Sequence, residues 1–182
     1  MISELQVRKL KRFFGLLDFN HNGVIEESDF TSIAENLCVL WGLREDTAEY
    51  VKIVTRFSET WKRFSFYVNN EDETASWEYI LDLANKYLVK ENQEQFSIYV
   101  DEFAGEIFDN FDTNNDGHIS VDEYLDLFMA YRIEVRYAAK AFRKLDRNDD
   151  DEISRAELMK AVKEFFLSTD EAAPGNWLFG AY

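Results

Sequence analysis

The sequence predicts an all-α fold in which four helix–loop–helix units form two pairs and pack into one compact globule, with the second unit degenerate. Two observations predict this fold. Apolar residues recur at helical spacing along most of the chain, and 46% of its 182 residues are hydrophobic, which is enough to fill a buried core. A twelve-residue pattern of oxygen-bearing side chains also recurs three times between the expected helices.

The recurring pattern has Asp first, Asn third, Asp or Asn fifth, Ile eighth and a carboxylate twelfth. It reads DFNHNGVIEESD at 18–29, DTNNDGHISVDE at 112–123 and DRNDDDEISRAE at 146–157. A hard divalent cation binds six to eight oxygens, and a loop of this length supplies them from positions one, three, five, seven, nine and twelve. The pattern therefore matches the EF-hand calcium loop, whereas an acidic run without this spacing is typical of solvated surface.

The first unit starts with a helix whose apolar face is formed by Leu10, Phe13, Phe14 and Leu17. In the loop that follows, Gly23 supplies the positive φ that the sixth position needs. The twelfth position is aspartate, which is one methylene shorter than glutamate and tends to offer a single oxygen. Magnesium accepts such a tight octahedral set, so we expect the first site to admit magnesium more readily than the other two sites.

The second unit has helical patterns on both sides of the polar stretch YVNNEDETASWE. If Glu78 takes the twelfth position, Tyr67 takes the first, Thr74 the eighth and Ala75 the ninth. A tyrosine cannot replace the first carboxylate ligand, and the stretch has no central glycine. We interpret this unit as a degenerate hand kept for pairing, with a solvated acidic turn at Glu71, Asp72 and Glu73. The helical faces expected around it are Tyr50, Val54, Phe57, Trp61 and Phe64 before the loop, and Trp77, Ile80, Ala84 and Tyr87 after it.

The third and fourth units both carry the full pattern. The third has Gly117 in the sixth position, but the fourth has Asp151 there, at a cost of about 1 kcal/mol for positive φ. This cost should weaken the fourth site about tenfold without abolishing it. Ile25, Ile119 and Ile153, in the eighth positions, should form the short strand contacts that join loops in pairs. The helical faces are Phe96, Tyr99, Val100, Phe103, Ile107 and Phe111 before the third loop, and Leu158, Val162, Phe165 and Phe166 after the fourth.

The C-terminal segment is rich in apolar residues after Pro174, the only proline. Trp177, Leu178, Phe179 and Tyr182 would be an aggregation hazard on a loose end. We therefore predict that this tail docks between the two halves and locks the compact form.

Composition and charge exclude several classes of function. The formal net charge of −16 disfavours nucleic acid and anionic membrane surfaces as partners. No leader, lipidation signal or bilayer-length apolar run is present, so we expect a cytoplasmic monomer without a membrane anchor. The single cysteine, Cys38, cannot form an internal disulfide and should be a small buried hydrophobe. No nucleophile and base can be paired from the sequence, so we do not expect an enzyme.

The loops, the aromatic helices, the aspartate that ends the first loop and the tail GNWLFGAY together resemble the sarcoplasmic calcium-binding proteins, with calexcitin and calerythrin. The resemblance implies an N-terminal pair at 1–90, a C-terminal pair at 91–167 and a packed tail at 168–182. It implies three calcium ions, with magnesium possible at the first site, and backbone-oxygen ligation at the seventh position of each loop. The implied ligands are Asp18, Asn20, Asn22, Val24 and Asp29; Asp112, Asn114, Asp116, His118 and Glu123; and Asp146, Asn148, Asp150, Glu152 and Glu157.

Three functions are compatible with this family. A calcium and magnesium buffer is favoured, because the chain has only three methionines for an adaptable target groove and no Gly- or Pro-rich tether near residues 88–95. A calcium sensor acting on a protein target is the alternative, since calexcitin is considered a signalling molecule; the sequence identifies no such target. The third is a luciferin-type binding protein, resembling photoproteins and coelenterazine-binding proteins. Against it, His21 and His118 both lie inside calcium loops, and the chain ends in Tyr182 rather than proline.

Overall fold

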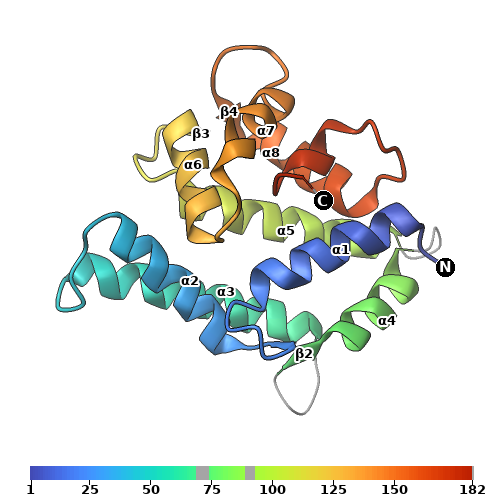
Figure 1. Cartoon of the computed structure of the whole chain (residues 1–182), viewed down its shortest axis with the longest axis horizontal. Coiled ribbons are helices and arrows are strands. Elements are labelled where there is room, and N and C mark those ends of the chain that lie inside the picture. Colours follow the sequence, from blue (N-terminus) through green and yellow to red (C-terminus); the bar gives the residue numbers. More distant parts are fainter. Residues whose placement is uncertain (69–73, 89–92, 182) are drawn as a thin grey trace.

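The computed structural model describes residues 1–68, 74–88 and 93–181 (Figure 1). Within these ranges the chain is mostly α-helical with two tiny sheets, so the predicted all-α fold class is confirmed, and no helix is long and apolar enough to cross a membrane. The elements are α1 (Glu4–Leu17), β1 (Val24–Ile25), α2 (Glu27–Leu40), α3 (Ala48–Val68), β2 (Ala75–Ser76), α4 (Trp77–Tyr87), α5 (Gln93–Phe111), β3 (His118–Ile119), α6 (Val121–Ala130), η1 (Val135–Tyr137), α7 (Ala138–Leu145), β4 (Ile153–Ser154), α8 (Arg155–Leu167) and η2 (Pro174–Trp177).

The short strands join the loops in pairs. β1 pairs antiparallel with β2, and β3 with β4. Ile119 lies opposite Ile153, as predicted from their shared eighth position. Ile25 lies opposite Ala75, one residue beyond the partner that the expected numbering of the second loop implied.

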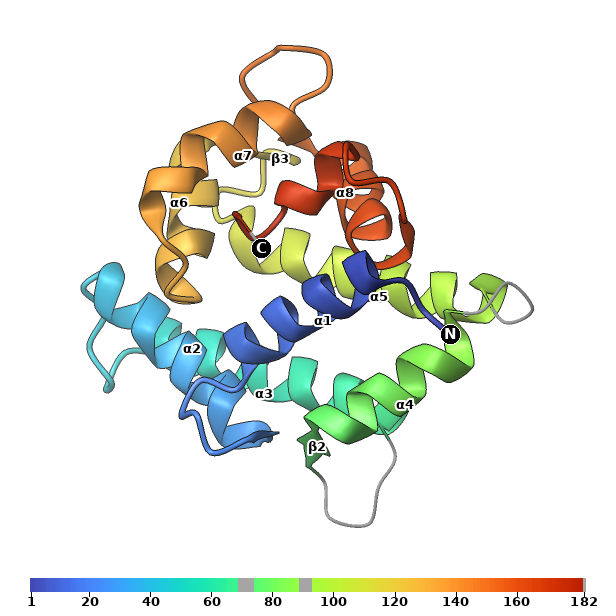
Figure 2. The same ribbon diagram turned by 45° about the vertical axis from the view of Figure 1, so that its right-hand side comes forward.

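One continuous core joins the two halves of the chain. The predicted apolar face of α1 is buried, and α1 packs on both α4 and α8. Figures 1 and 2 show α1 in the middle of the molecule, with α2, α3 and α4 on one side and α6, α7 and α8 on the other. Polar bonds add to the contact between halves: Asn36 Nδ2 in α2 donates to the carbonyls of Met129 and Ala130, each at 3.0 Å, and Trp41 Nε1 donates to Asp126 Oδ2 at 2.7 Å.

The C-terminal tail packs between α1 and the C-terminal helices, and its role in locking the compact form stays a prediction. Leu178 is fully buried, and the ring of Phe179 lies 5.8 Å from that of Phe13 in α1 and 5.1 Å from that of Phe165 in α8. Tyr182, the last member of the predicted apolar tail, lies outside the described residues. The tail therefore connects the first helix of the chain with the last.

Cys38 lies in α2 and has no exposed surface, as expected of a buried hydrophobe. Burial raises the pKa of its thiol, so it is a poor nucleophile at neutral pH.

Candidate metal-binding loops

In each of the three loops that carry the full pattern, one set of hydrogen bonds closes the backbone around the side-chain oxygens. The first-position aspartate accepts from the sixth N–H, and the third and fifth side chains accept from the N–H two residues on. In the first loop these bonds are Gly23 N to Asp18 Oδ2 at 3.1 Å, Asn22 N to Asn20 Oδ1 at 2.9 Å and Val24 N to Asn22 Oδ1 at 3.0 Å. The equivalent donors are Gly117, Asp116 and His118 in the third loop, and Asp151, Asp150 and Glu152 in the fourth. These bonds fold the three side chains over their own loop.

The sixth position has positive φ in all three loops. Gly23 and Gly117 both have φ of 89°, and Asp151 adopts 64°, so the aspartate takes the conformation that the pattern requires. The fourth position is also left-handed, although the spacing alone did not indicate it. Its occupants are Asn, Asp or His, the non-glycine residues most often found in this region. They are His21, Asn115 and Asp149, with φ of 60°, 58° and 57°.

The twelfth-position carboxylate holds the two ends of each loop together. Asp29 Oδ1 accepts from Phe19 N at 3.0 Å, and Asp29 Oδ2 accepts from Glu26 N at 2.9 Å. The ninth residue is the N-cap of the outgoing helix and the twelfth is its third residue, so the pair forms a capping box. The same carboxylate bonds link Glu123 to the N–H groups of Thr113 and Ser120, and Glu157 to those of Arg147 and Ser154.

These carboxylates are buried, and their environments shift their pKa values in opposite directions. Asp29 has no exposed surface, and burial raises its pKa despite three backbone hydrogen bonds, with the charge of Asp18 adding to the rise. Burial alone would raise the pKa of Glu123, but the hydrogen bonds from Ser120 and Thr113 lower it below the usual value. Glu123 is therefore a ready anion at neutral pH.

The donor set fits a hard divalent cation. Each loop offers carboxylate, amide and carbonyl oxygens, which are the ligands of calcium and magnesium. Asp18 Oδ1 is buried and has no hydrogen-bond partner among the described residues, a costly arrangement unless a cation approaches it. Among the described residues, no group of three Asp, Glu, His or Cys side chains is close enough together to hold a metal ion. The twelfth-position carboxylates are instead bonded to backbone amides, and asparagines supply part of each donor set.

Glu26 was absent from the ligand set that the family resemblance implied. It occupies the ninth position of the first loop, and its Oε1 accepts from Asn22 Nδ2 at 3.0 Å and from Asn20 Nδ2 at 3.3 Å. The carboxylate thus lies beside two implied ligands. The ninth position of this loop type often contributes through water, so an acid at that position was the available signal.

The second loop has a different numbering from the one expected. Ala75 pairs with the eighth residue of the first loop, and Ser76 caps α4 by accepting from Tyr79 N, as the ninth-position serines do in the third and fourth loops. The first, eighth, ninth and twelfth positions are therefore Val68, Ala75, Ser76 and Tyr79, in place of Tyr67, Thr74, Ala75 and Glu78. Neither end of this loop supplies a carboxylate. The acidic turn expected at Glu71, Asp72 and Glu73 lies outside the described residues.

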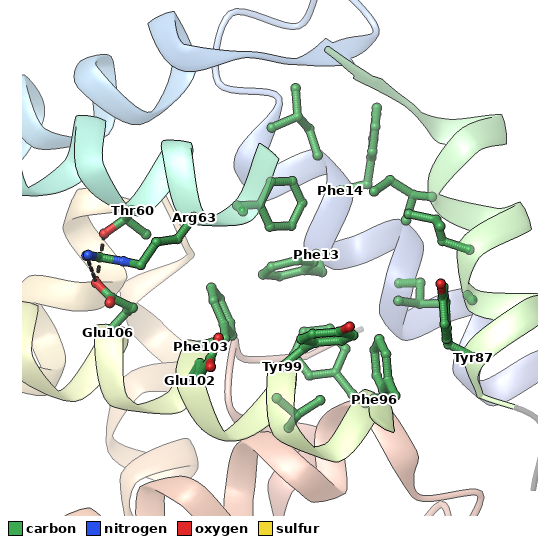
Figure 3. A pocket seen from close by; sticks show the side chains of 18 residues that line it. Phe13, Phe14, Thr60, Arg63, Tyr87, Phe96, Tyr99, Glu102, Phe103 and Glu106 are labelled. Atoms are coloured by element: carbon green, nitrogen blue, oxygen red, sulfur yellow. Dashed lines mark hydrogen bonds and ion pairs between the residues drawn. The ribbon is translucent and has the colours of Figure 1, made fainter. Parts of the chain in front are cut away.

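An apolar cavity of about 170 Å³ lies among α1, α3, α4, α5 and α8 (Figure 3). Eight of its 18 lining residues are aromatic, including Phe13, Phe14 and Phe103. At its polar end lies Glu106, whose Oε2 accepts from Thr60 Oγ1 at 3.0 Å and from Arg63 Nη2 at 2.8 Å. Pattern analysis could not locate this cavity, because it depends on how five helices pack.

Two family profiles match the chain. The profile described as EF-hand domain pair matches residues 7–129, and the profile described as EF hand matches residues 138–163. Together they cover the three loops with the full pattern and the second loop, which lies between the first and the third.

Known proteins with similar sequences or folds include three of particular interest. Calerythrin from Saccharopolyspora erythraea is 24% identical over 166 residues, which cover 91% of this chain and 94% of the relative. The calcium-loaded apo form of coelenterazine-binding protein from Renilla muelleri superposes with a TM-score of 0.82 and 24% identity over the full length of both chains. A sarcoplasmic calcium-binding protein from amphioxus superposes with a TM-score of 0.70 and 18% identity, also over both full lengths. At these identities the structural matches show a shared fold.

Proposed function

The chain belongs to the EF-hand family, and from that premise we propose that it is a calcium and magnesium buffer with three metal sites, in the loops that begin at Asp18, Asp112 and Asp146. The observation that carries the proposal is the shared scaffold: these three loops have the same hydrogen bonds, left-handed sixth residue and buried carboxylate. The second loop has Val68 and Tyr79 at its ends, so we assign it no ion.

The ions would be held by side-chain oxygens of the first, third, fifth and twelfth residues and by the carbonyl oxygen of the seventh. A bound divalent ion supplies positive charge that offsets the repulsion among the loop acids. Three such ions would bring the formal charge from −16 to −10, so calcium should raise thermal stability. The ligands we propose are those that the family resemblance implies, with the ninth-position Glu26 added in the first loop through water.

We expect magnesium to occupy the first loop at rest, and such occupancy would favour a buffering role. Asp29 is the shorter carboxylate at the twelfth position, and the two other loops have Glu123 and Glu157 there. A site filled by magnesium at rest releases it slowly when calcium rises, and such exchange buffers calcium without a large opening of the helices.

The packing between the halves also favours a buffer over a sensor. A sensor exposes an apolar groove when calcium binds. Here the bonds from Asn36 and Trp41 join the halves, and the tail fills the space between α1 and α8 with Leu178 and Phe179. Opening a groove would require these buried contacts to separate.

A luciferin-type binding protein is the second candidate, because this chain has both an apolar cavity and a fold similar to that of the coelenterazine-binding protein. The cavity of about 170 Å³ is close to the ~150 Å³ that holds a benzene ring and below the ~300 Å³ of pockets for larger ligands. A multi-ring luciferin would therefore need the cavity to widen.

A fluorescence titration with coelenterazine, with and without calcium, tests the second candidate. A cavity-filling variant, Ala84→Leu, serves as the matched control, since Ala84 lines the cavity and is buried. Saturable binding of coelenterazine that Ala84→Leu abolishes would establish the luciferin-type role. If the wild type does not bind coelenterazine, the luciferin-type role is excluded and the buffer remains as the proposed function.

Calorimetric titration with calcium, in the absence and presence of magnesium, tests the main proposal. We expect three ions in the wild type and two in Glu123→Gln and in Glu157→Gln. Glu78→Gln is the matched control, because Glu78 is an exposed acid in the eleventh position of the second loop. A control variant that loses an ion would overturn the assignment of the second loop as silent.

A further inference from the structure

Arg147 connects the fourth loop to helix α8. It is the second residue of the loop, and its backbone N–H donates to Glu157 Oε1, in the twelfth position, at 2.8 Å. Its guanidinium Nη2 donates to Glu164 Oε2 at 2.7 Å, and the two side chains are only 24% and 21% exposed. The second residue of the fourth loop therefore carries a partly buried guanidinium that is bonded to α8.

Glu164 in turn connects α8 to the tail. The oxygen that binds Arg147 also accepts the N–H of Gly175 at 2.8 Å. Gly175 packs so closely on α8 that a Cβ there would lie 2.3 Å from the carbonyl oxygen of Ala161. The path from the metal loop to the tail therefore runs through three residues and two hydrogen bonds.

Other buried bonds hold the same tail in register. Lys9 Nζ donates to Asn176 Oδ1 at 2.8 Å, and neither residue is more than 1% exposed. Tyr124 Oη donates to the carbonyl oxygen of Leu178 at 2.8 Å, and Tyr124 directly follows the twelfth-position carboxylate of the third loop. The tail is therefore seated on the helices that leave both C-terminal loops.

We propose that Glu164 is a positioning residue that couples cation binding in the loop at Asp146 to docking of the tail. The inference rests on the proposed function, in that this loop must bind calcium. The guanidinium of Arg147 repels a cation in its own loop, and Glu164 neutralises that charge. The Gly175 N–H holds Glu164 in place, so the docked tail raises the cation affinity of the loop.

Thermodynamic linkage makes this coupling reciprocal. If the docked tail raises calcium affinity by a given factor, calcium favours the docked tail by the same factor. Coupling between two sites in proteins starts at about fivefold, and we expect a change of that order here. Calcium should therefore slow hydrogen exchange of tail amides beyond any general gain in stability.

The test compares Glu164→Gln with Glu171→Gln. Both changes remove a carboxylate that is ion-paired with arginine, but the pair of Glu171 with Arg8 is exposed and neither of its residues belongs to a metal loop. Calorimetry should show the fourth site weakened about fivefold in Glu164→Gln only, with the first and third sites unchanged. Exchange measured by mass spectrometry over residues 170–181 should lose its calcium dependence in the same variant.

Arg147→Met separates this role from simple loosening of the fold. Removing the repelling charge should tighten calcium binding at the fourth site, whereas general destabilisation would weaken it. In the double variant, Glu164→Gln should have little further effect on calcium, because its effect acts through Arg147. Unchanged affinity in Glu164→Gln, or additive effects in the double variant, would overturn the coupling. Absence of any calcium at the fourth loop of the wild type would instead overturn the proposed function.

Discussion

Replacing Gly175 by alanine should release the tail and lower the melting temperature. An added Cβ would lie 2.3 Å from the carbonyl oxygen of Ala161 and 2.6 Å from Glu164 Cβ. The first of these atoms belongs to the backbone of α8 and cannot turn aside, so the tail must move. Overpacking costs about 1–3 kcal/mol, and losing the Gly175 N–H bond to a carboxylate costs about 1.5–3 kcal/mol.

The free energy of unfolding should therefore fall by about 2.5–6 kcal/mol, which in a chain of this size lowers the melting temperature by about 5–24 °C. Differential scanning calorimetry of the calcium-loaded protein measures it. Gly15→Ala is the matched control: Gly15 lies in α1 with nothing within 4 Å of an added Cβ, so alanine should stabilise the helix by about 0.5–1 kcal/mol. If Gly175→Ala melts within about 2 °C of the wild type, the tail does not pack on α8 as tightly as this reasoning requires.

Three further variants test separate parts of the molecule. Asp29→Glu should shift the first site toward calcium and weaken its magnesium binding severalfold, which calorimetry would detect; equal magnesium affinity would show that carboxylate length does not set selectivity. Burial lowers the pKa of Lys9 to about 8 from an unfolded value of 10.5. Between these two pH values the unfolded state binds more protons than the folded state, so the contribution of Lys9 to the free energy of unfolding rises with pH, by about 3 kcal/mol in all. Denaturant titrations from pH 7 to 10.5 should show this rise in the wild type and in the exposed control Lys11→Met, but not in Lys9→Met; equal slopes in all three would contradict it. Tyr124→Phe should cost about 1–3 kcal/mol by leaving the buried carbonyl of Leu178 without its donor, and an unchanged denaturation midpoint would show that bond to be unimportant.

The helices and the three full loops could be predicted from the sequence because their signals are local. The spacing of oxygen-bearing residues within twelve positions fixes the loop, and the apolar face of α1 needs only helical periodicity. Asp151 illustrates this: its place in the pattern predicted positive φ, and the structure has φ of 64° there.

The second loop was misnumbered because it has no such local signal. Without a first-position carboxylate or a central glycine, Glu78 was the nearest acid to serve as an anchor. Its position is decided instead by a long-range contact, the pairing of Ala75 with Ile25, and by the cap that Ser76 provides to α4. Likewise, the contact of Glu164 with Arg147 and Gly175 could not be predicted from the repeated loop pattern, because it depends on how the tail packs against α8.

Counting bound calcium ions tests the central claim most directly. The protein would be stripped of metal with a chelator, exchanged into a volatile buffer with excess calcium and weighed by native mass spectrometry. Three loops with one shared scaffold predict a dominant species with three calcium ions, and Glu123→Gln and Glu157→Gln should each carry two. A dominant species with four ions would contradict the assignment of Val68 and Tyr79 to a silent loop, and one with two or fewer would contradict the assignment of three metal sites.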